Sequence, residues 1–234
     1  MGWIALRAIA AATCAVSLVV SGPVSAQDLS HLDKGFSAYD SGNYAGAMEH
    51  FRIAAAQGDA VAQFNLGFMY RNGEGVPKND VEAVKWYRLA AAQGDVGAQF
   101  NLGLMYRNGE GVPENYADAV KWYRLAASQG YAGAQSNLGM MYYHGMGVPK
   151  NDTEAVKWYR LAAAQGDADA RNNLGFMYGN GEGVPKDYVQ AYKWYNLAAA
   201  QGVAMARTNM EAIQKLMTPQ QIAEAQRLSA EAVR

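Results

Sequence analysis

The residues of this chain whose spacing could support chemistry lie in a glycine-rich segment that occurs four times. The first copy is Gly73-Glu74-Gly75, and the later copies begin at Gly109, Gly145 and Gly181. Glycine-rich loops that bind phosphate follow a strand and open onto a helix, whereas each of these segments follows a helical pattern. We therefore interpret the segments as turns and not as a nucleotide site.

Three of the four copies carry a glutamate between the glycines, at Glu74, Glu110 and Glu182. Such carboxylates could face one another as an acid–base pair, but Met146 takes the same place in the remaining copy. A solvated position in a loop accounts for all four residues. We therefore interpret the glutamates as exposed loop residues.

Other nucleophiles and metal ligands are sparse. The histidines are His31, His50 and His144, and we assign them to different units without a cysteine nearby, so no metal-ligand spacing is evident. No serine stands in a Gly-x-Ser-x-Gly motif. The sequence thus predicts no catalytic residue, no metal ion and no cofactor.

A repeat of 36 residues positions these segments. The dipeptide Gln-Gly marks the period at Gln57, Gln93, Gln129, Gln165 and Gln201. A fixed period of about 20–50 residues is typical of a stack of similar supersecondary units.

Each period contains two helical patterns. In the first copy, apolar residues at spacings of three and four indicate a helix over 60–70, and Gly73 suits the left-handed position just past its end. Asn79 precedes the second helix, and Glu82 stands three residues later, as in a capping box. No window alternates with a period of two, so the unit is predicted to be a helical hairpin and the fold all-α.

A glycine recurs inside the first helix of each unit, at Gly67, Gly103, Gly139 and Gly175. A glycine within a helix costs about 1 kcal/mol relative to alanine. We therefore expect another helix to approach these positions so closely that a side chain would collide. The tryptophans of the second helices, beginning with Trp86, are expected to fill the wider gaps between hairpins.

The repeated text also carries a family pattern. The string Asn-Leu-Gly-x-Met-Tyr-x-x-Gly-x-Gly-Val-Pro, followed by Ala-x-x-Trp-Tyr and Ala-Ala-x-x-Gly, closely resembles the Sel1-like repeat over residues 57–200. That family is a longer-looped relative of the tetratricopeptide repeat. The resemblance implies a right-handed α–α solenoid, a TPR-like superhelix. It also implies a role as an adaptor or scaffold for other proteins, often in export, at the cell envelope or in signalling.

One branch of that family is exported and staples its repeats with disulfides. This chain has a single cysteine, Cys14, and therefore departs from that branch. The penicillin-binding or hydrolase roles associated with the branch are accordingly not implied for this sequence.

Residues 1–26 do not follow the repeat. Arg7 precedes a largely apolar run over 8–20, and Val24-Ser25-Ala26 offers small residues for cleavage, a pattern typical of a secretory signal peptide. A retained membrane anchor is the alternative, but a membrane span needs about 20 apolar residues. We therefore expect cleavage after Ala26, export to the periplasm or the medium, and no stable membrane insertion afterwards.

Cleavage would leave a chain of balanced charge. The mature chain would carry 19 basic and 21 acidic residues, a formal charge of −2. That balance does not favour binding to nucleic acid or to an anionic membrane surface.

The predicted boundaries follow the Gln-Gly marks. A shorter, tetratricopeptide-like hairpin over 27–56 caps the N-terminal end, and capping helices with a polar outer side occupy 201–234. The four Sel1-like repeats between them span 57–92, 93–128, 129–164 and 165–200.

The first helix of each unit offers a candidate binding face. If Leu66 faces the core, Phe64, Phe68 and Arg71 point away from it, because each helical residue turns by about 100°. The resemblance places first helices on the concave side of the stack, where contiguous apolar side chains would indicate a binding surface. The candidate partner-binding residues are Phe64, Asn65, Phe68, Arg71, Phe100, Asn101, Leu104, Arg107, Asn137, Met140, Tyr143, Asn173 and Phe176.

Two alternatives stay open at this face. Neighbouring hairpins could cover the apolar side chains by stacking. The asparagines equivalent to Asn65 could bind the backbone of a partner segment or tie each hairpin to the next, and their identity in four units favours the second role. Positions that differ between units are then the better candidates for partner specificity, as at Phe64, Phe100, Ser136 and Asn172.

The function that the sequence favours is an exported, monomeric, non-enzymatic scaffold that binds a protein or peptide partner on the concave face. One alternative is a peptidoglycan binder or a regulator of cell-wall enzymes, because stacked aromatic rings also suit sugar faces. The least favoured alternative is a hydrolase with a β-lactamase-like activity.

The signal peptide predicts that the mature protein begins at Gln27. Intact-mass measurement or N-terminal sequencing of the protein recovered from its producing cells would test this expectation. Recovery of the chain from membranes with Met1 retained would contradict it.

Overall fold

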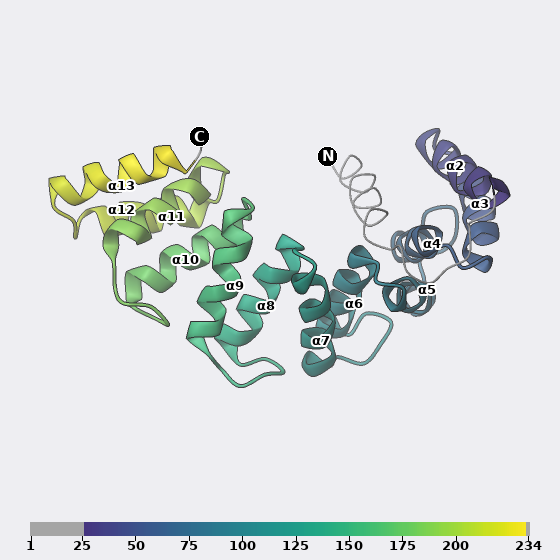
Figure 1. The fold of residues 1–234 in the computed structure, drawn as a ribbon, viewed down its shortest axis with the longest axis horizontal. Helices are drawn as coiled ribbons and strands as arrows, with labels where there is room; N and C mark the ends of the chain where they lie inside the picture. The colour runs from purple at the N-terminus through teal and green to yellow at the C-terminus, as the bar shows by residue number, and fades with distance from the viewer. Residues whose placement is uncertain (1–25, 233–234) are drawn as a thin grey trace. The chain divides into compact units, whose positions relative to one another are not determined.

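The structure is a computed structural model that describes residues 26–232, with side chains from residue 31 onward. The predicted signal peptide, apart from Ala26, lies outside the described residues. Within this part of the chain there are 12 helices and no strands, which confirms the all-α solenoid of helical hairpins (Figure 1).

The helices come in pairs of similar length. They are α2 (Ala26–Asp40), α3 (Tyr44–Ala56), α4 (Ala60–Asn72), α5 (Asp80–Ala92), α6 (Val96–Asn108), α7 (Tyr116–Ser128), α8 (Ala132–His144), α9 (Asp152–Ala164), α10 (Ala168–Asn180), α11 (Tyr188–Ala200), α12 (Ala204–Gln214) and α13 (Pro219–Glu231).

The chain divides into two compact units, Met1–Ala126 and Ala127–Arg234. In the first unit, helices α2 to α6 each pack against the next helix along the chain, and α7 packs against α6. In the second unit, α8 to α12 are stacked in the same way, and α13 returns to pack against α11.

Polar side chains and glycines fix the helix ends. The Asp59 carboxylate accepts a hydrogen bond from the Ala62 backbone N–H at 2.7 Å at the start of α4. Asn79 caps α5 in the same way through the Glu82 N–H. Gly73 ends α4 in the left-handed conformation (φ 74°), as predicted. The Glu82 side chain pairs with Lys85, so the reciprocal half of the predicted capping box is not formed.

The glycines inside the first helices lie under tyrosine rings. A Cβ added at Gly67 would come within 2.7 Å of the Tyr87 ring, and one at Gly139 within 2.8 Å of the Tyr159 ring. Gly103 and Gly175 meet Tyr123 and Tyr195 in the same way. The prediction of a close approach at these glycines is confirmed, and the approaching group is an aromatic ring of the second helix.

Tyrosine is therefore the large buried residue of the second helix. Tyr87 is fully buried, whereas its neighbour Trp86 is only half-buried and packs against an apolar cluster that α3 and α4 form between them. The tryptophans thus lie at the seam between hairpins, and the tyrosines close the four hairpins from α4 to α11 from within.

A polar contact joins each hairpin to the one before it. The buried Gln63 side chain donates from Nε2 to the Ala55 carbonyl at 3.2 Å, and Gln99 and Gln135 bind the carbonyls of Ala91 and Ala127 in the same way. These acceptors lie in the last turns of second helices, and each also accepts from the backbone N–H of the glycine that follows its helix, at Gly58, Gly94 and Gly130. The following hairpin therefore adds a second hydrogen bond to each of these carbonyls.

The glycine-rich turns also contact the preceding hairpin. Gly75, the second glycine of its turn, has φ 73° and lies against the Tyr44 backbone at the start of α3. Gly111 lies against Asp80 in the same position of the next hairpin. Both the backbone conformation and the lack of a side chain are needed there, which confirms that these segments are turns.

The hairpin of α10 and α11 differs from the hairpins before it on its outer side. Leu89, Leu125 and Leu161 hold the same position in α5, α7 and α9, and each is 41–50% exposed. Their equivalent in α11, Leu197, is only 3% exposed. Since α13 is the additional helix that packs on α11, it covers the surface that the other second helices leave open.

Overpacking the contact beneath Tyr159 should destabilise the fold. Gly139→Leu is expected to lower the free energy of unfolding by about 1–3 kcal/mol, because the new side chain has no space beside the ring. Chemical denaturation followed by circular dichroism would measure the loss.

The matched control is Glu211→Leu, which alters the same repeat position in α12, where the residue is exposed. Equal losses of stability in the two variants would show that the tyrosine contact is not the cause.

Candidate partner-binding face

Phe64 does not face water, so this part of the predicted binding face is wrong. Its side chain is only 8% exposed, and its ring centroid lies 5.7 Å from that of Tyr87. A Cβ added at Gly97 would come within 2.9 Å of the Phe64 ring. Phe64 therefore fills the seam between its own hairpin and the next one, as the stacking alternative allowed.

Phe100 has the same role in the following hairpin to a lesser degree. It is half-buried, and its ring centroid lies 6.0 Å from that of Tyr123. In the second unit the equivalent residues are Ser136 and Asn172, and the Asn172 carbonyl oxygen is itself buried. Phe64 and Phe100 therefore contribute to packing, and partner specificity at the positions that differ between units stays a prediction.

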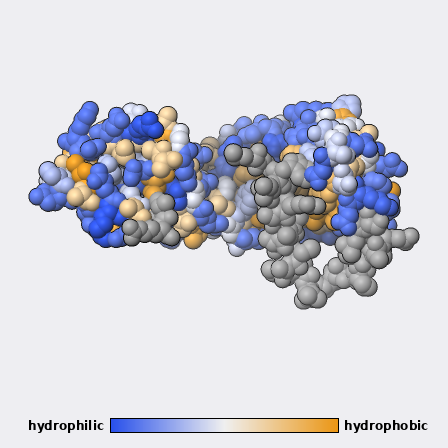
Figure 2. Space-filling view, turned by 90° about the horizontal axis from the view of Figure 1, so that it is seen from above, coloured by the Kyte–Doolittle hydropathy of each residue, from blue (hydrophilic) through white to orange (hydrophobic). Residues whose placement is uncertain are grey.

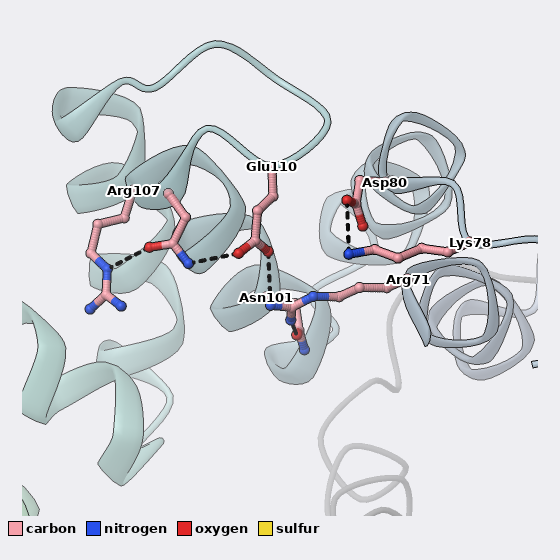
Figure 3. Close-up of polar contacts among 7 residues, drawn as sticks. Arg71, Lys78, Asp80, Asn101, Arg107 and Glu110 are labelled. Atoms are coloured by element: carbon pink, nitrogen blue, oxygen red, sulfur yellow. Dashed lines mark hydrogen bonds and ion pairs between the residues drawn. The ribbon is translucent and has the colours of Figure 1, made fainter. Parts of the chain in front are cut away.

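Arg71 is engaged inside the stack. Its guanidinium donates to the Asn101 carbonyl oxygen at 2.7 Å and pairs with the Glu110 carboxylate at 3.0 Å (Figure 3). Both partners belong to the next hairpin, on α6 and on the turn after it. Arg71 thus links two hairpins, and its role in partner binding stays a prediction.

The polar contacts continue beyond Glu110 (Figure 3). Asn108 donates from Nδ2 to the Glu110 carboxylate at 2.9 Å, and Arg107 donates from Nε to the Asn108 carbonyl oxygen at 3.2 Å. The Lys78–Asp80 ion pair lies apart from these hydrogen bonds, at the start of α5. Arg107 is thus tethered to its own helix end.

The turn glutamates are only partly exposed and are bound by side chains of the previous hairpin, which corrects the expectation of free loop residues. Glu74 accepts a hydrogen bond from the Tyr39 hydroxyl at 2.6 Å, as Glu110 does from Arg71. Burial raises the pKa of Tyr143, and Glu182, which lies beside its hydroxyl, raises it further. In each case the glutamate binds the residue near the end of the previous first helix.

This link was missed in the sequence, although a signal was present. Arg71 and Tyr143 hold the same repeat position, and each binds the turn glutamate 39 residues later. Reading the two positions together across the repeats would have shown a polar donor paired with an acid.

The equivalent asparagines of the first helices are largely engaged in hydrogen bonds within the fold. The amides of Asn65, Asn101 and Asn137 donate to carbonyls four residues earlier in their own helices, at 2.7–3.0 Å. Asn101 also accepts from Arg71, and the Asn173 amide lies beside the Tyr159 hydroxyl. Asn101 and Asn173 therefore link neighbouring hairpins. Partner binding by the four asparagines stays a prediction.

Burial raises the pKa values of buried tyrosines in the second helices. Burial raises the pKa of Tyr87, although the nearby positive charge of Arg71 lowers it in part. Burial also raises the pKa of Tyr195 to about 12, while a hydrogen bond from Asn209 opposes the shift. The pKa values of both hydroxyls thus lie above the ordinary value for tyrosine.

The accessible part of the predicted face follows one repeat position. Phe68, Leu104 and Met140 are half-buried there, and Phe176 is 38% exposed. In the second unit the Phe176 ring makes an edge contact with Tyr143, with centroids 6.0 Å apart. On the face that Figure 2 shows, hydrophobic residues form small patches among hydrophilic ones.

His31 and His50 lie close together, contrary to their assignment to different units. They face each other from α2 and α3, the two helices of the first hairpin. Among residues 31–232, no three or more histidine, cysteine, aspartate and glutamate side chains gather into a group that could hold a metal ion. In the described chain no helix is both long and apolar enough to cross a membrane.

The repeat pattern has a clear counterpart among protein families. The Sel1 repeat matches residues 34–59, 60–95, 96–131, 132–167 and 168–203. This chain belongs to the Sel1 repeat family. The matches number five, one more than predicted, and the four longer ones begin three residues after the predicted boundaries.

Solved Sel1 repeat structures resemble this chain closely. A protective antigen present in uropathogenic Escherichia coli strains is 37% identical with a TM-score of 0.78, over 87% of this chain and 46% of the antigen. A Sel1 repeat protein from Oxalobacter formigenes is 41% identical with a TM-score of 0.71, over 75% of this chain and 72% of that protein.

Two rhizobial relatives share shorter segments. The exopolysaccharide production negative regulator of Rhizobium meliloti (strain 1021) is 47% identical over 51 residues, 22% of this chain and 19% of the relative. The protein of the same name from Rhizobium leguminosarum bv. viciae is 38% identical over 82 residues, 30% of this chain and 31% of the relative. The matches thus span less than a third of each relative.

The two phenylalanines of α4 should differ in their effect on stability. Phe64→Ala is expected to lower the free energy of unfolding of this Sel1 repeat protein by about 3–5 kcal/mol, because it empties a buried seam. Phe68→Ala should cost at least about 1 kcal/mol less, because its side chain is less buried. Denaturant titrations of both variants would test the order, and a larger loss for Phe68→Ala would reverse the assignment.

Proposed function

We propose that this protein is an exported, non-enzymatic scaffold that binds a segment of another protein on the accessible side of its first helices. The observation that carries the proposal is the Tyr143–Phe176 pair, in which aromatic side chains of α8 and α10 meet and one of them stays exposed. Sel1 repeats often mediate protein–protein interactions, and this chain has five of them.

The aromatic pair has the character of an interface anchor. Aromatic residues dominate the energetics of protein interfaces and keep few rotatable bonds. Tyr143 lies beside Glu182, and the Lys150 ammonium lies 5.3 Å from the centre of its ring. These neighbours hold the ring in place, so a partner would meet a surface that is already ordered, which favours affinity.

The pair also joins two adjacent hairpins of the second unit. A partner segment that covers Phe176 would contact α10 and reach Tyr143 on α8. Single exposed apolar residues are common on protein surfaces, whereas contiguous ones point to interaction. Phe68 and Leu104 hold the same repeat position on α4 and α6 of the first unit, and they are candidate contacts of the same kind there.

The polar chemistry of the chain supports a binding role over catalysis. Glu74 and Glu110 are bound to Tyr39 and Arg71, and Glu182 lies beside Tyr143. The apolar run and small residues over 1–26 support export.

A second candidate function is the control of surface-polysaccharide production through such a partner. The names of the two rhizobial relatives favour it over a direct cell-wall binder. A scaffold of this kind would bind a protein component of the assembly machinery and would not sediment with the polymer. Co-sedimentation of the pure chain with washed peptidoglycan or exopolysaccharide would instead favour the glycan-binding alternative.

The partner-binding proposal predicts that Phe176→Ala weakens capture of the partner by about 1–3 kcal/mol, the range of an interface hot spot. The protein should keep its fold, because the side chain is among the exposed large hydrophobic residues. Proteins retained from an envelope extract by the unaltered chain would be identified first, and their affinity for both forms would then be measured with pure components.

Leu161→Ala is the matched control, since Leu161 is 50% exposed on the second helix α9. Equal binding by the unaltered chain and Phe176→Ala would exclude Phe176 from the interface. Equal weakening by Phe176→Ala and Leu161→Ala would show that the loss is not specific to the aromatic pair.

A further inference from the structure

Two of the three histidines meet at the first hairpin. The Nδ1 atoms of His31 on α2 and His50 on α3 lie 3.2 Å apart, and the ring centroids are separated by 5.4 Å. Both side chains are half-buried. Neither the partner-binding face nor the links between hairpins use this pair.

The helices beneath the pair are held firmly. Phe51, which follows His50, is fully buried and makes an edge contact with Phe36, with centroids 5.3 Å apart. A Cβ added at Gly35 would come within 2.6 Å of the Phe51 ring, so α2 and α3 are in close contact one turn along from His31. The separation of the two imidazoles is therefore set by the packed core of the hairpin.

The distance between the two Nδ1 atoms suits two ligands of one metal ion. Zinc–nitrogen bonds of about 2.0–2.1 Å at a tetrahedral angle place two nitrogens about 3.3 Å apart. We propose that His31 and His50 form a two-histidine site for a first-row transition-metal ion of the kind that imidazole binds, Cu²⁺ or Zn²⁺.

Binding exchanges a hydrogen bond for two coordinate bonds. In the neutral pair one ring donates its Nδ1 proton to the Nδ1 lone pair of the other. The metal ion takes both Nδ1 lone pairs, and the donor ring then carries its proton on Nε2. The Nδ1 atoms keep nearly their present distance, and the rings turn so that both lone pairs point at the ion.

The proposed site is open and selective for soft or borderline ions. In the described residues no third histidine, cysteine or carboxylate completes a ligand group, so water molecules would fill the remaining positions. Imidazole ligands suit zinc, copper and nickel, and copper(II) binds most tightly in the Irving–Williams order. Calcium and magnesium, which prefer oxygen ligands, are not expected to bind.

The test uses the full chain without a histidine tag. Titration calorimetry with Zn²⁺ should give one ion per chain, and electron paramagnetic resonance of the Cu²⁺ form should show two coupled imidazole nitrogens. His31→Ala and His50→Ala should each weaken binding by roughly tenfold or more, since the loss of outer partners alone often costs 10–100-fold. His144→Ala is the matched control and should bind as the unaltered chain does.

Three results would overturn the site: no saturable binding of either ion, unchanged binding by His50→Ala, or loss of binding in His144→Ala. Circular dichroism of each variant would show whether the hairpin is still folded. If a variant unfolds, the nitrogen count on the unaltered Cu²⁺ form decides, and a count other than two contradicts the proposal.

Discussion

A tyrosine ring lying on a helical glycine is the contact on which the rest of this structure depends. It closes the four hairpins from α4 to α11, as where the Tyr87 ring occupies the space beside Gly67 that a side chain would need. The helix loses about 1 kcal/mol of intrinsic propensity at each such glycine, and burial of a large aromatic residue offsets that loss. In the second unit the far end of the ring serves a further purpose. The hydroxyl of Tyr159 reaches Asn173, so the residue that completes one hairpin also touches the next.

Polar links join the hairpins. Two residues that make them, Arg71 and Asn101, are among the candidate partner-binding residues of the sequence. Arg71, Asn101 and Glu110 form a connected group that neither hairpin could complete alone. Buried glutamines such as Gln99 donate a further hydrogen bond to helix-end carbonyls of the preceding hairpin. A repeat protein whose neighbours share hydrogen bonds in this way gains its stability at the seams. The positions left for partners are therefore few, and Phe176 stands out among them.

Periodicity was enough to predict the hairpins, the turns and the close approach at Gly67, because each of these depends on residues near in sequence. Phe64 was misplaced for a physical reason. A helical wheel centred on Leu66 separates the side that faces the partner helix from the opposite side. In a stack, however, a first helix also packs against the next hairpin, so Phe64 is covered by α6. His31 and His50 lie 19 residues apart, and only the packing of the hairpin brings them together.

The fit of Phe64 against Gly97 has a consequence for how such a chain can grow or be rearranged. A repeat that presents phenylalanine at this seam must be followed by one that presents glycine. The repeat over 96–131 carries both Gly97 and Phe100, so a tandem duplication of it would place a compatible pair at the new junction. In the repeat over 168–203, Asp169 takes the position of Gly97. If that repeat followed the one that carries Phe64, it would bring a carboxylate against an aromatic ring. The residues at each contact between repeats thus restrict which repeat can follow which, and the repeats of this solenoid are not freely interchangeable.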